Sequence, residues 1–91
     1  PGGRTIPNTV LNVVVNVVDY GLPVQAAVDA PRLHHQWFPD RVDHEDFPGY
    51  RELAGKLRAL GHVVRTHRQG DAHSIAIDPK TGVRTAGVDG R

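Results

Sequence analysis

The chain has 91 residues, with 11 basic and 10 acidic side chains, a net charge of +1 and 38% hydrophobic residues. This length allows one domain with a small core, and the balanced charge does not point to a nucleic acid or an anionic membrane as partner. Cysteine is absent, which excludes disulfides, zinc–thiolate sites and thiol redox chemistry. No apolar run is long enough to cross a bilayer, and a start at Pro-Gly-Gly without methionine indicates a processed chain or a fragment.

In residues 6–21, the conformational preference of the individual residues and the periodicity of the polar residues predict different structures. The many valines favour a strand, but the polar residues recur every three or four positions: Asn8, Asn12, Asn16 and Asp19. This spacing makes a single narrow stripe on a helix, whereas a strand would divide the same residues between two faces. We therefore expect a largely buried helix with Thr5 near its N-terminal cap and Gly21 just beyond its end.

The middle of the chain predicts a short helix, two strands and a second helix. Pro23 opens the short helix VQAAVDA, and Pro31 ends it. The run RLHHQWF has the pattern of a strand, and RVDHED that of a short edge strand. Its acidic residues, Asp43, Glu45 and Asp46, are expected in a solvated turn or edge. PGYRELAGKLRALGH is the clearest amphipathic helix, with Leu53, Leu57 and Leu60 on one face and Gly61 as its terminator.

The last third predicts strands. HVVRTH is followed by the polar loop RQGD, and the runs AHSIAID and VRTAGVD, separated by PKTG, predict a hairpin. The fold class expected from this order is mixed α+β, with helices packed on a sheet that has antiparallel pairs. No repeat or linker divides the chain.

The first candidate site is the glycine pair, Gly2 and Gly3. A glycine-rich turn before a helix presents backbone N–H groups that have no partner within the helix. With the positive end of the helix dipole, these groups suit a carboxylate, a phosphate or a developing oxyanion. The plain structural alternative is a tight turn.

The other candidates are weaker. Six histidines (His34, His35, His44, His62, His67 and His73) lack the spacing of a metal site, and adjacent strand residues such as His34 and His35 point to opposite faces. The sole serine, Ser74, lies in a strand pattern without the turn that exposes a nucleophile. An N-terminal proline with a lowered pKa can act as a general base, so a small tautomerase dependent on Pro1 is a third possibility. We expect no metal and no cofactor.

Several segments together resemble the small subunit of gamma-glutamyltransferases. They are the Pro-Gly-Gly turn of Pro1 to Gly3, Asp19 to Gly21, the Ala-Val-Asp-Ala-Pro-Arg stretch of Ala27 to Arg32, His34 to Trp37, and the closing hairpin Gly70 to Arg91. The resemblance covers nearly the whole chain, in the family's order. It implies a portion of the four-layer αββα sandwich of N-terminal-nucleophile hydrolases, with residues 1–91 as one partial domain from the C-terminal part of the small subunit.

The resemblance also implies an activity. Family precursors cleave themselves, and the new N-terminal threonine attacks a gamma-glutamyl amide such as glutathione, whose acyl group passes to water or to an amine. Gly2 and Gly3 would supply amides to the oxyanion hole. The nucleophile and its neighbouring serines would lie upstream, so the 91 residues alone are expected to be inactive. The family's usual Asp-Pro-Arg ending is replaced by Val88-Asp89-Gly90-Arg91.

The implied partners are the upstream remainder of the small subunit, the large subunit of the same precursor and a gamma-glutamyl substrate. Self-association of the isolated chain is a further expectation, and the resemblance implies a periplasmic or secreted location. The alternatives are an acylase or amidohydrolase with a different acyl substrate, and a non-catalytic αβ module that binds a partner protein.

Overall fold

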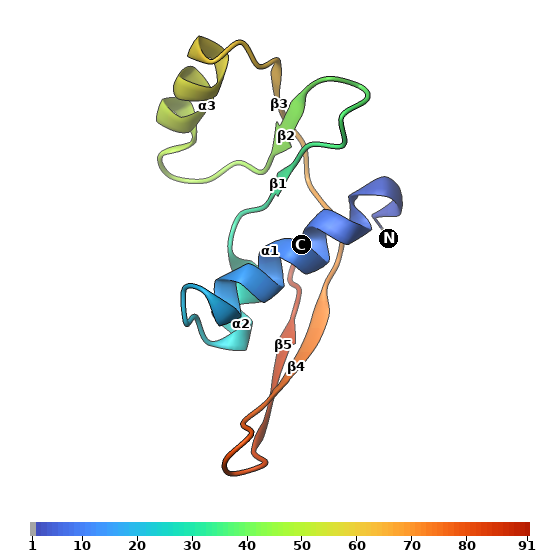
Figure 1. Cartoon of the computed structure of the whole chain (residues 1–91), viewed down its shortest axis with the longest axis vertical. Coiled ribbons are helices and arrows are strands. Elements are labelled where there is room, and N and C mark those ends of the chain that lie inside the picture. Colours follow the sequence, from blue (N-terminus) through green and yellow to red (C-terminus); the bar gives the residue numbers. More distant parts are fainter. Residues whose placement is uncertain (1) are drawn as a thin grey trace.

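The computed structural model describes residues 2–91, in which helices and two small sheets alternate along an elongated body (Figure 1). The elements are η1 (Gly3–Thr5), α1 (Ile6–Val18), α2 (Val24–Asp29), β1 (Leu33–His34), β2 (Val42–His44), α3 (Tyr50–Ala59), β3 (Val64–Thr66), β4 (His73–Ile77) and β5 (Arg84–Val88). The principal extents are 46 × 26 × 21 Å. The mixed α+β class expected from the sequence is confirmed.

The first sheet has the order β1-β2-β3. β1 and β2 are antiparallel, whereas β2 and β3 are parallel and are joined through α3, with Val42 opposite Val64. The edge position expected for residues 41–46 is therefore wrong, because α3 returns the chain so that β3 pairs with the free side of β2. The parallel pairing needs such a crossover.

The strand expected over RLHHQWF is only two residues long. The His35 ring accepts a hydrogen bond from the Trp37 N–H at 3.1 Å. Trp37 has a φ of +71°, which turns the backbone out of the extended region. Strand β1 therefore ends at His34, and Trp37 is 84% exposed.

The second sheet is the hairpin β4–β5, as expected. Its register pairs His73 with Val88 and Ile77 with Arg84. The Asp78 carboxylate accepts hydrogen bonds from the backbone N–H groups of Lys80 at 2.7 Å and Thr81 at 3.2 Å. Gly82 supplies the left-handed φ of +73° that completes the turn.

Helix α1 is confirmed, but its predicted burial is wrong for this chain. Only Thr9 and Val13 of its 13 residues are buried, while Val10 and Leu11 are more than half exposed. The asparagine stripe faces inward because its amides bond to carbonyl oxygens of β1, of His35 just after β1 and of α2, leaving much of the apolar surface outside. Gly21 lies beyond the helix end with a φ of +65°.

The apolar core lies where α1 and α2 meet the base of the hairpin. Val13, Ala27 and Val28 form its buried centre, with Val17, Leu22 and Ala72 packed around them. Strand β5 approaches α2 so closely that a Cβ on Gly87 would lie 2.8 Å from the Val24 carbonyl oxygen. Helix α3 follows the predicted pattern, although Leu60 is 76% exposed and lies at the C-cap.

The acidic residues of the β2 region are not on a solvated edge. Asp43 and Glu45 are buried, and only Asp46 is exposed. Arginines from distant segments reach both buried carboxylates: Arg65 bonds to Asp43 at 2.8 and 2.9 Å, and Arg91 bonds to Glu45 at 2.6 and 2.7 Å. These partners satisfy the buried charges, as burial requires.

Candidate functional site

The glycine pair forms a closed turn at the start of α1. The Thr5 N–H and hydroxyl both donate to the Gly2 carbonyl oxygen, at 2.9 and 2.8 Å. Gly2 has a φ of +127°, and a Cβ there would lie 3.1 Å from Ile6 Cγ1. Gly3 has a φ of +51° and open space where its Cβ would be. Gly2 is therefore required by conformation and space, and Gly3 by conformation alone.

This turn opens into a hollow of about 480 Å³. The hollow is lined by Gly2, Thr5, His67, Arg68, Gly70 and Asp71. Within residues 2–91 the Gly3 N–H makes no hydrogen bond, and α1 directs the positive end of its dipole toward the turn. Gly3 lies next to the lining residue Gly2 and is not itself part of the lining. The helix N-terminus and the Arg68 guanidinium favour a negatively charged group in the hollow, whereas the Asp71 carboxylate in the same lining opposes one.

The loop that forms the opposite wall of the hollow is fixed from behind at Gln69, which is completely buried. Its backbone N–H donates to Glu45 Oε1 at 2.9 Å, and its carbonyl oxygen accepts from the Arg32 guanidinium at 2.7 Å. Its side-chain amide donates to the carbonyl oxygens of Arg32 and Asp43, at 3.1 and 3.0 Å.

Gln69 bonds to a buried ionic network of four charged side chains. Its positive members are Arg32 and Arg91, and its negative members are Glu45 and Asp89. Arg32 pairs with Asp89 at 2.7 Å, and Arg91 bridges Asp89 at 3.0 Å and Glu45 at 2.6 Å. The four charges cancel, which is the condition under which buried ions are tolerated.

The network holds its carboxylates in the ionised form. Burial alone would raise the pKa of Glu45, but hydrogen bonds from Arg91 and from the Gln69 N–H outweigh it and leave that pKa below its ordinary value. Burial likewise opposes ionisation of Asp89, yet the Ala72 N–H and Arg91 hold the Asp89 pKa well below its usual range. Glu45 raises the pKa of Arg91 in return.

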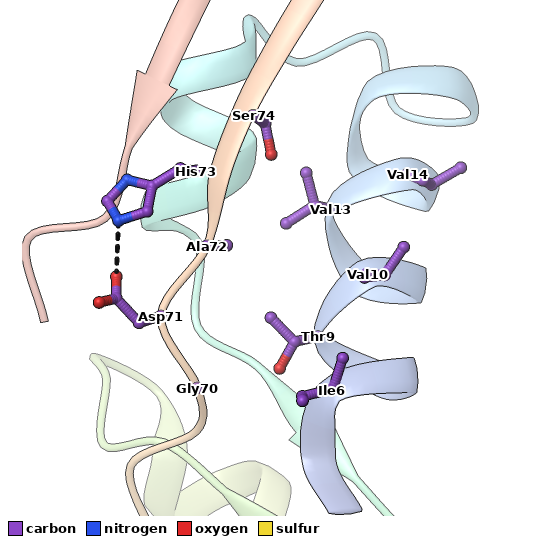
Figure 2. Close-up of a pocket in the computed structure, with 10 residues that line it drawn as sticks. All are labelled: Ile6, Thr9, Val10, Val13, Val14, Gly70, Asp71, Ala72, His73 and Ser74. Atoms are coloured by element: carbon purple, nitrogen blue, oxygen red, sulfur yellow. Dashed lines mark ion pairs between the residues drawn. The ribbon is translucent and has the colours of Figure 1, made fainter. Parts of the chain in front are cut away.

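A second hollow, of about 240 Å³, follows the seam between α1 and the segment that leads into β4 (Figure 2). Thr9 and Val13 of α1 lie opposite Gly70 and Ala72 in this seam. Ser74 also lines it, half-buried and within β4, without the turn of an exposed nucleophile. His73 and Asp71 also line it, and the His73 ring lies 3.5 Å from the Asp71 carboxylate.

The structure separates the remaining candidates. His34 is buried and bonds to Asn8 at 2.9 Å and to Gln36 at 2.8 Å, whereas His35 is exposed and pairs with Asp40. Among residues 2–91, no three histidine or acidic side chains converge in a geometry that could hold a metal ion. Pro1, the candidate general base, lies outside the described residues. No helix within residues 2–91 has the length and hydropathy to cross a membrane.

Known proteins share both the sequence and this arrangement. The sequence model of the gamma-glutamyltranspeptidase family matches residues 1–91. The chain belongs to the gamma-glutamyltranspeptidase family. It is 45% identical over 82 residues to the glutathione hydrolase proenzyme of Escherichia coli K12, a match that covers 87% of this chain and 14% of the relative. The corresponding proenzyme of Pseudomonas aeruginosa is 36% identical over 86 residues, covering 88% of this chain and 15% of that protein.

The fold is also that of the family. The crystal structure of Helicobacter pylori gamma-glutamyltranspeptidase, solved as a threonine-to-alanine mutant, superimposes with a TM-score of 0.90 at 38% identity, covering 99% of this chain. The prediction of a portion of an N-terminal-nucleophile hydrolase sandwich is therefore confirmed. The chain spans about half of that solved chain and about one seventh of the E. coli and P. aeruginosa proenzymes.

Sequence reasoning missed the wall opposite the glycine turn. The sequence predicts only a polar loop over residues 68–71, yet Arg68, Gly70 and Asp71 line the hollow. The available signal was Gly70, an isolated glycine in a loop, which adopts a left-handed φ of +63°. Nothing in the local sequence indicates that this glycine faces the turn 68 positions earlier.

Proposed function

We propose that this chain acts within a longer gamma-glutamyltransferase-like enzyme that transfers or hydrolyses the gamma-glutamyl group of glutathione and related amides. Residues 1–91 form a partial domain from the C-terminal part of its small subunit. The family match over the whole chain and the relatives named glutathione hydrolase proenzymes support this proposal. Its partners are the upstream remainder of the small subunit and the large subunit of the same precursor.

In this proposal, Gly2 and Gly3 contribute backbone N–H groups to an oxyanion hole. A threonine hydroxyl supplied from upstream attacks the gamma-glutamyl carbonyl carbon, and the carbonyl oxygen takes up negative charge until the C–N bond breaks. Pre-positioned N–H groups stabilise that charge more than the neutral substrate. The observation that carries the assignment is the left-handed glycine turn at the start of α1. The Gly3 N–H has no partner within residues 2–91, and the neighbouring Gly2 lines a hollow shared with Arg68.

The isolated chain is inactive in this proposal, because an oxyanion hole without a nucleophile can only bind. Activity assays on residues 1–91 with a chromogenic gamma-glutamyl anilide should therefore give the rate of the buffer alone. Turnover that remains after rigorous purification would contradict the assignment of the nucleophile to another segment.

The test of the site is Gly3→Val in the complete enzyme. The valine side chain would not be crowded, since no atom lies within 4 Å of the Cβ position. The change should act through the backbone, because a β-branched residue strongly disfavours the φ of +51° and would reorient the N–H. We expect turnover to fall about 10²- to 10³-fold, the usual cost of one oxyanion donor.

The matched control is Gly82→Val in the β4–β5 turn, where φ is +73° and the Cβ position is also open. It imposes comparable backbone strain far from the glycine pair, so its turnover should stay near that of the wild type. Near-normal turnover of Gly3→Val would show that the glycine pair is only a tight turn.

A further inference from the structure

Gly70 lies between the Gly2–Gly3 turn and helix α1, with little free space on either side. A Cβ on Gly70 would lie 2.9 Å from Thr9 Oγ1 and 3.4 Å from Thr9 Cγ2. On the other side, the Cα of Gly70 lies 3.4 Å from the position a Cβ would take on Gly2. Figure 2 shows Gly70 and Thr9 facing each other across the seam. A side chain at position 70 therefore requires Thr9, the helix that carries it or the loop to shift.

The loop that contains Gly70 is held in place by hydrogen bonds of the adjacent residue, Gln69. Gln69 makes four hydrogen bonds to three residues, two of which belong to the buried ionic network. The amide of Ala72, on the other side of Gly70, donates to Asp89 Oδ2 at 2.9 Å. Hydrogen bonds to the ionic network therefore fix the loop on both sides of Gly70.

We propose that Gly70, held by Gln69 and the ionic network, is a positioning residue that sets the orientation of the Gly2–Gly3 turn. It acts through its close fit against Gly2 and against Thr9 of α1. The consequence for catalysis rests on the proposed function of the turn, whereas the consequence for the turn's rigidity does not.

The probe is Gly70→Ala in the complete enzyme. The added methyl group meets Thr9 Oγ1 at 2.9 Å, so Thr9 must shift, and in our proposal the start of α1 moves with it. We expect faster hydrogen–deuterium exchange, measured by mass spectrometry, in the peptide that contains residues 3–6. In the processed enzyme we expect kcat and kcat/KM to fall together, by about 10- to 100-fold, as misplacement of a transition-state donor predicts.

The structure offers a compensating change. Thr9 Oγ1 has no hydrogen-bond partner within residues 2–91, so Thr9→Ala removes no such bond. It leaves Thr9 Cβ at 3.6 Å from the new methyl group, an ordinary contact. The double variant Gly70→Ala with Thr9→Ala should recover both the slow exchange and most of the turnover, although the left-handed strain at position 70 remains.

Gly82→Ala separates that strain from the contact, since Gly82 has a similar φ of +73° and nothing near its Cβ position. It should leave exchange at residues 3–6 and turnover at wild-type values. Gln69→Met is a second probe, which removes two hydrogen bonds of the anchor without adding atoms against α1. It too should speed exchange in the turn.

The outcomes distinguish the two proposals. Faster exchange in the turn with a fall in kcat, both reversed by Thr9→Ala, supports the positioning role. Faster exchange with unchanged kcat also supports positioning but removes the turn from catalysis, and the proposed function of the glycines fails. The positioning role is overturned if exchange in Gly70→Ala is no faster than in Gly82→Ala, or if Thr9→Ala does not reverse the defect. In that case the turnover of Gly3→Val still tests the oxyanion hole independently.

Discussion

Glu45 joins three segments that are far apart in the sequence. Its carboxylate accepts the backbone N–H groups of Arg32 and Gln69, at 3.0 and 2.9 Å, and pairs with the Arg91 guanidinium. Each of these partners would be left with an unsatisfied buried donor if the carboxylate were lost. Removing one member of a buried ion pair costs about 3–5 kcal/mol, mostly through the charge left behind.

We predict that Glu45→Gln lowers the free energy of unfolding of the complete enzyme by about 3 kcal/mol at pH 7. The folded-state pKa of Glu45 is below its ordinary value of 4.5. Its contribution is therefore complete above the unfolded pKa and disappears as pH falls through the folded pKa. Denaturant melts from pH 7 to pH 3 should show a shallower acid dependence for Glu45→Gln than for the wild type. Parallel pH profiles would contradict this role.

The burial of Glu45 could not be read from the sequence. Glutamate beside aspartate in a short polar run is usually solvated, and nothing local shows that Arg32, Gln69 and Arg91 converge on it. The glycine pair is different: its left-handed turn follows from backbone properties that a local sequence does reveal. The residues that support the site, such as Gly70, depend on contacts made at long range.

Helix α1 docks through side-chain amides in addition to the apolar contacts of Val13 and Val17. In the asparagine stripe, Asn12 bonds to β1 through both ends of its side-chain amide. Its Nδ2 donates to the Leu33 carbonyl oxygen at 3.1 Å, and its Oδ1 accepts a hydrogen bond from the Leu33 N–H at 3.4 Å. The side chain thus pairs with β1 much as a neighbouring strand would. Asn16, in contrast, makes a single long bond of 3.4 Å to the Ala27 carbonyl oxygen.

We predict that Asn12→Ala destabilises the complete enzyme by about 1–2 kcal/mol, because both backbone groups of Leu33 lose their partner. Asn16→Ala is the matched comparison on the same helix and should cost less than about half as much. Chemical denaturation of both variants measures the difference. Equal costs would show that the loss comes from helix propensity and not from the pairing with β1.

Most elements could be predicted because their signals are local. The stripe in α1, the leucine face of α3 and the turn between β4 and β5 each depend on residues within one element. The errors concern tertiary placement: which side of α1 is covered, and which side of β2 receives β3. A periodicity of polar residues identifies a helix but does not state which stripe faces the rest of the chain.

The whole molecule is more elongated than a compact domain of its size, and more of its apolar surface is exposed. Its radius of gyration is 14.4 Å, against roughly 12 Å for a compact domain of this length. On α1, Leu11, Val14 and Val18 share one face and are 55%, 49% and 73% exposed. Ile75 and Ile77 on the hairpin are also mostly exposed. Apolar surface of this kind marks an interaction site or leads to association.

We predict that the isolated 91-residue chain self-associates at micromolar concentration. Sedimentation velocity should give species heavier than the 9.9 kDa monomer. Replacing Val10 and Val14 with lysine should shift the distribution toward monomer, because both are about half exposed on α1. A monomer that melts cooperatively without these changes would contradict the prediction.

The neutral network of Arg32, Asp89, Arg91 and Glu45 also limits how this sequence can diverge. Any single replacement by a neutral residue leaves one buried charge without its counterpart, whereas replacing an arginine together with its carboxylate keeps the sum at zero. We therefore expect accepted changes to come as coordinated pairs, Arg32 with Asp89 or Arg91 with Glu45. The segment before β1, the residue after β2 and the chain beyond β5 are thus expected to diverge together, although they lie up to 59 positions apart.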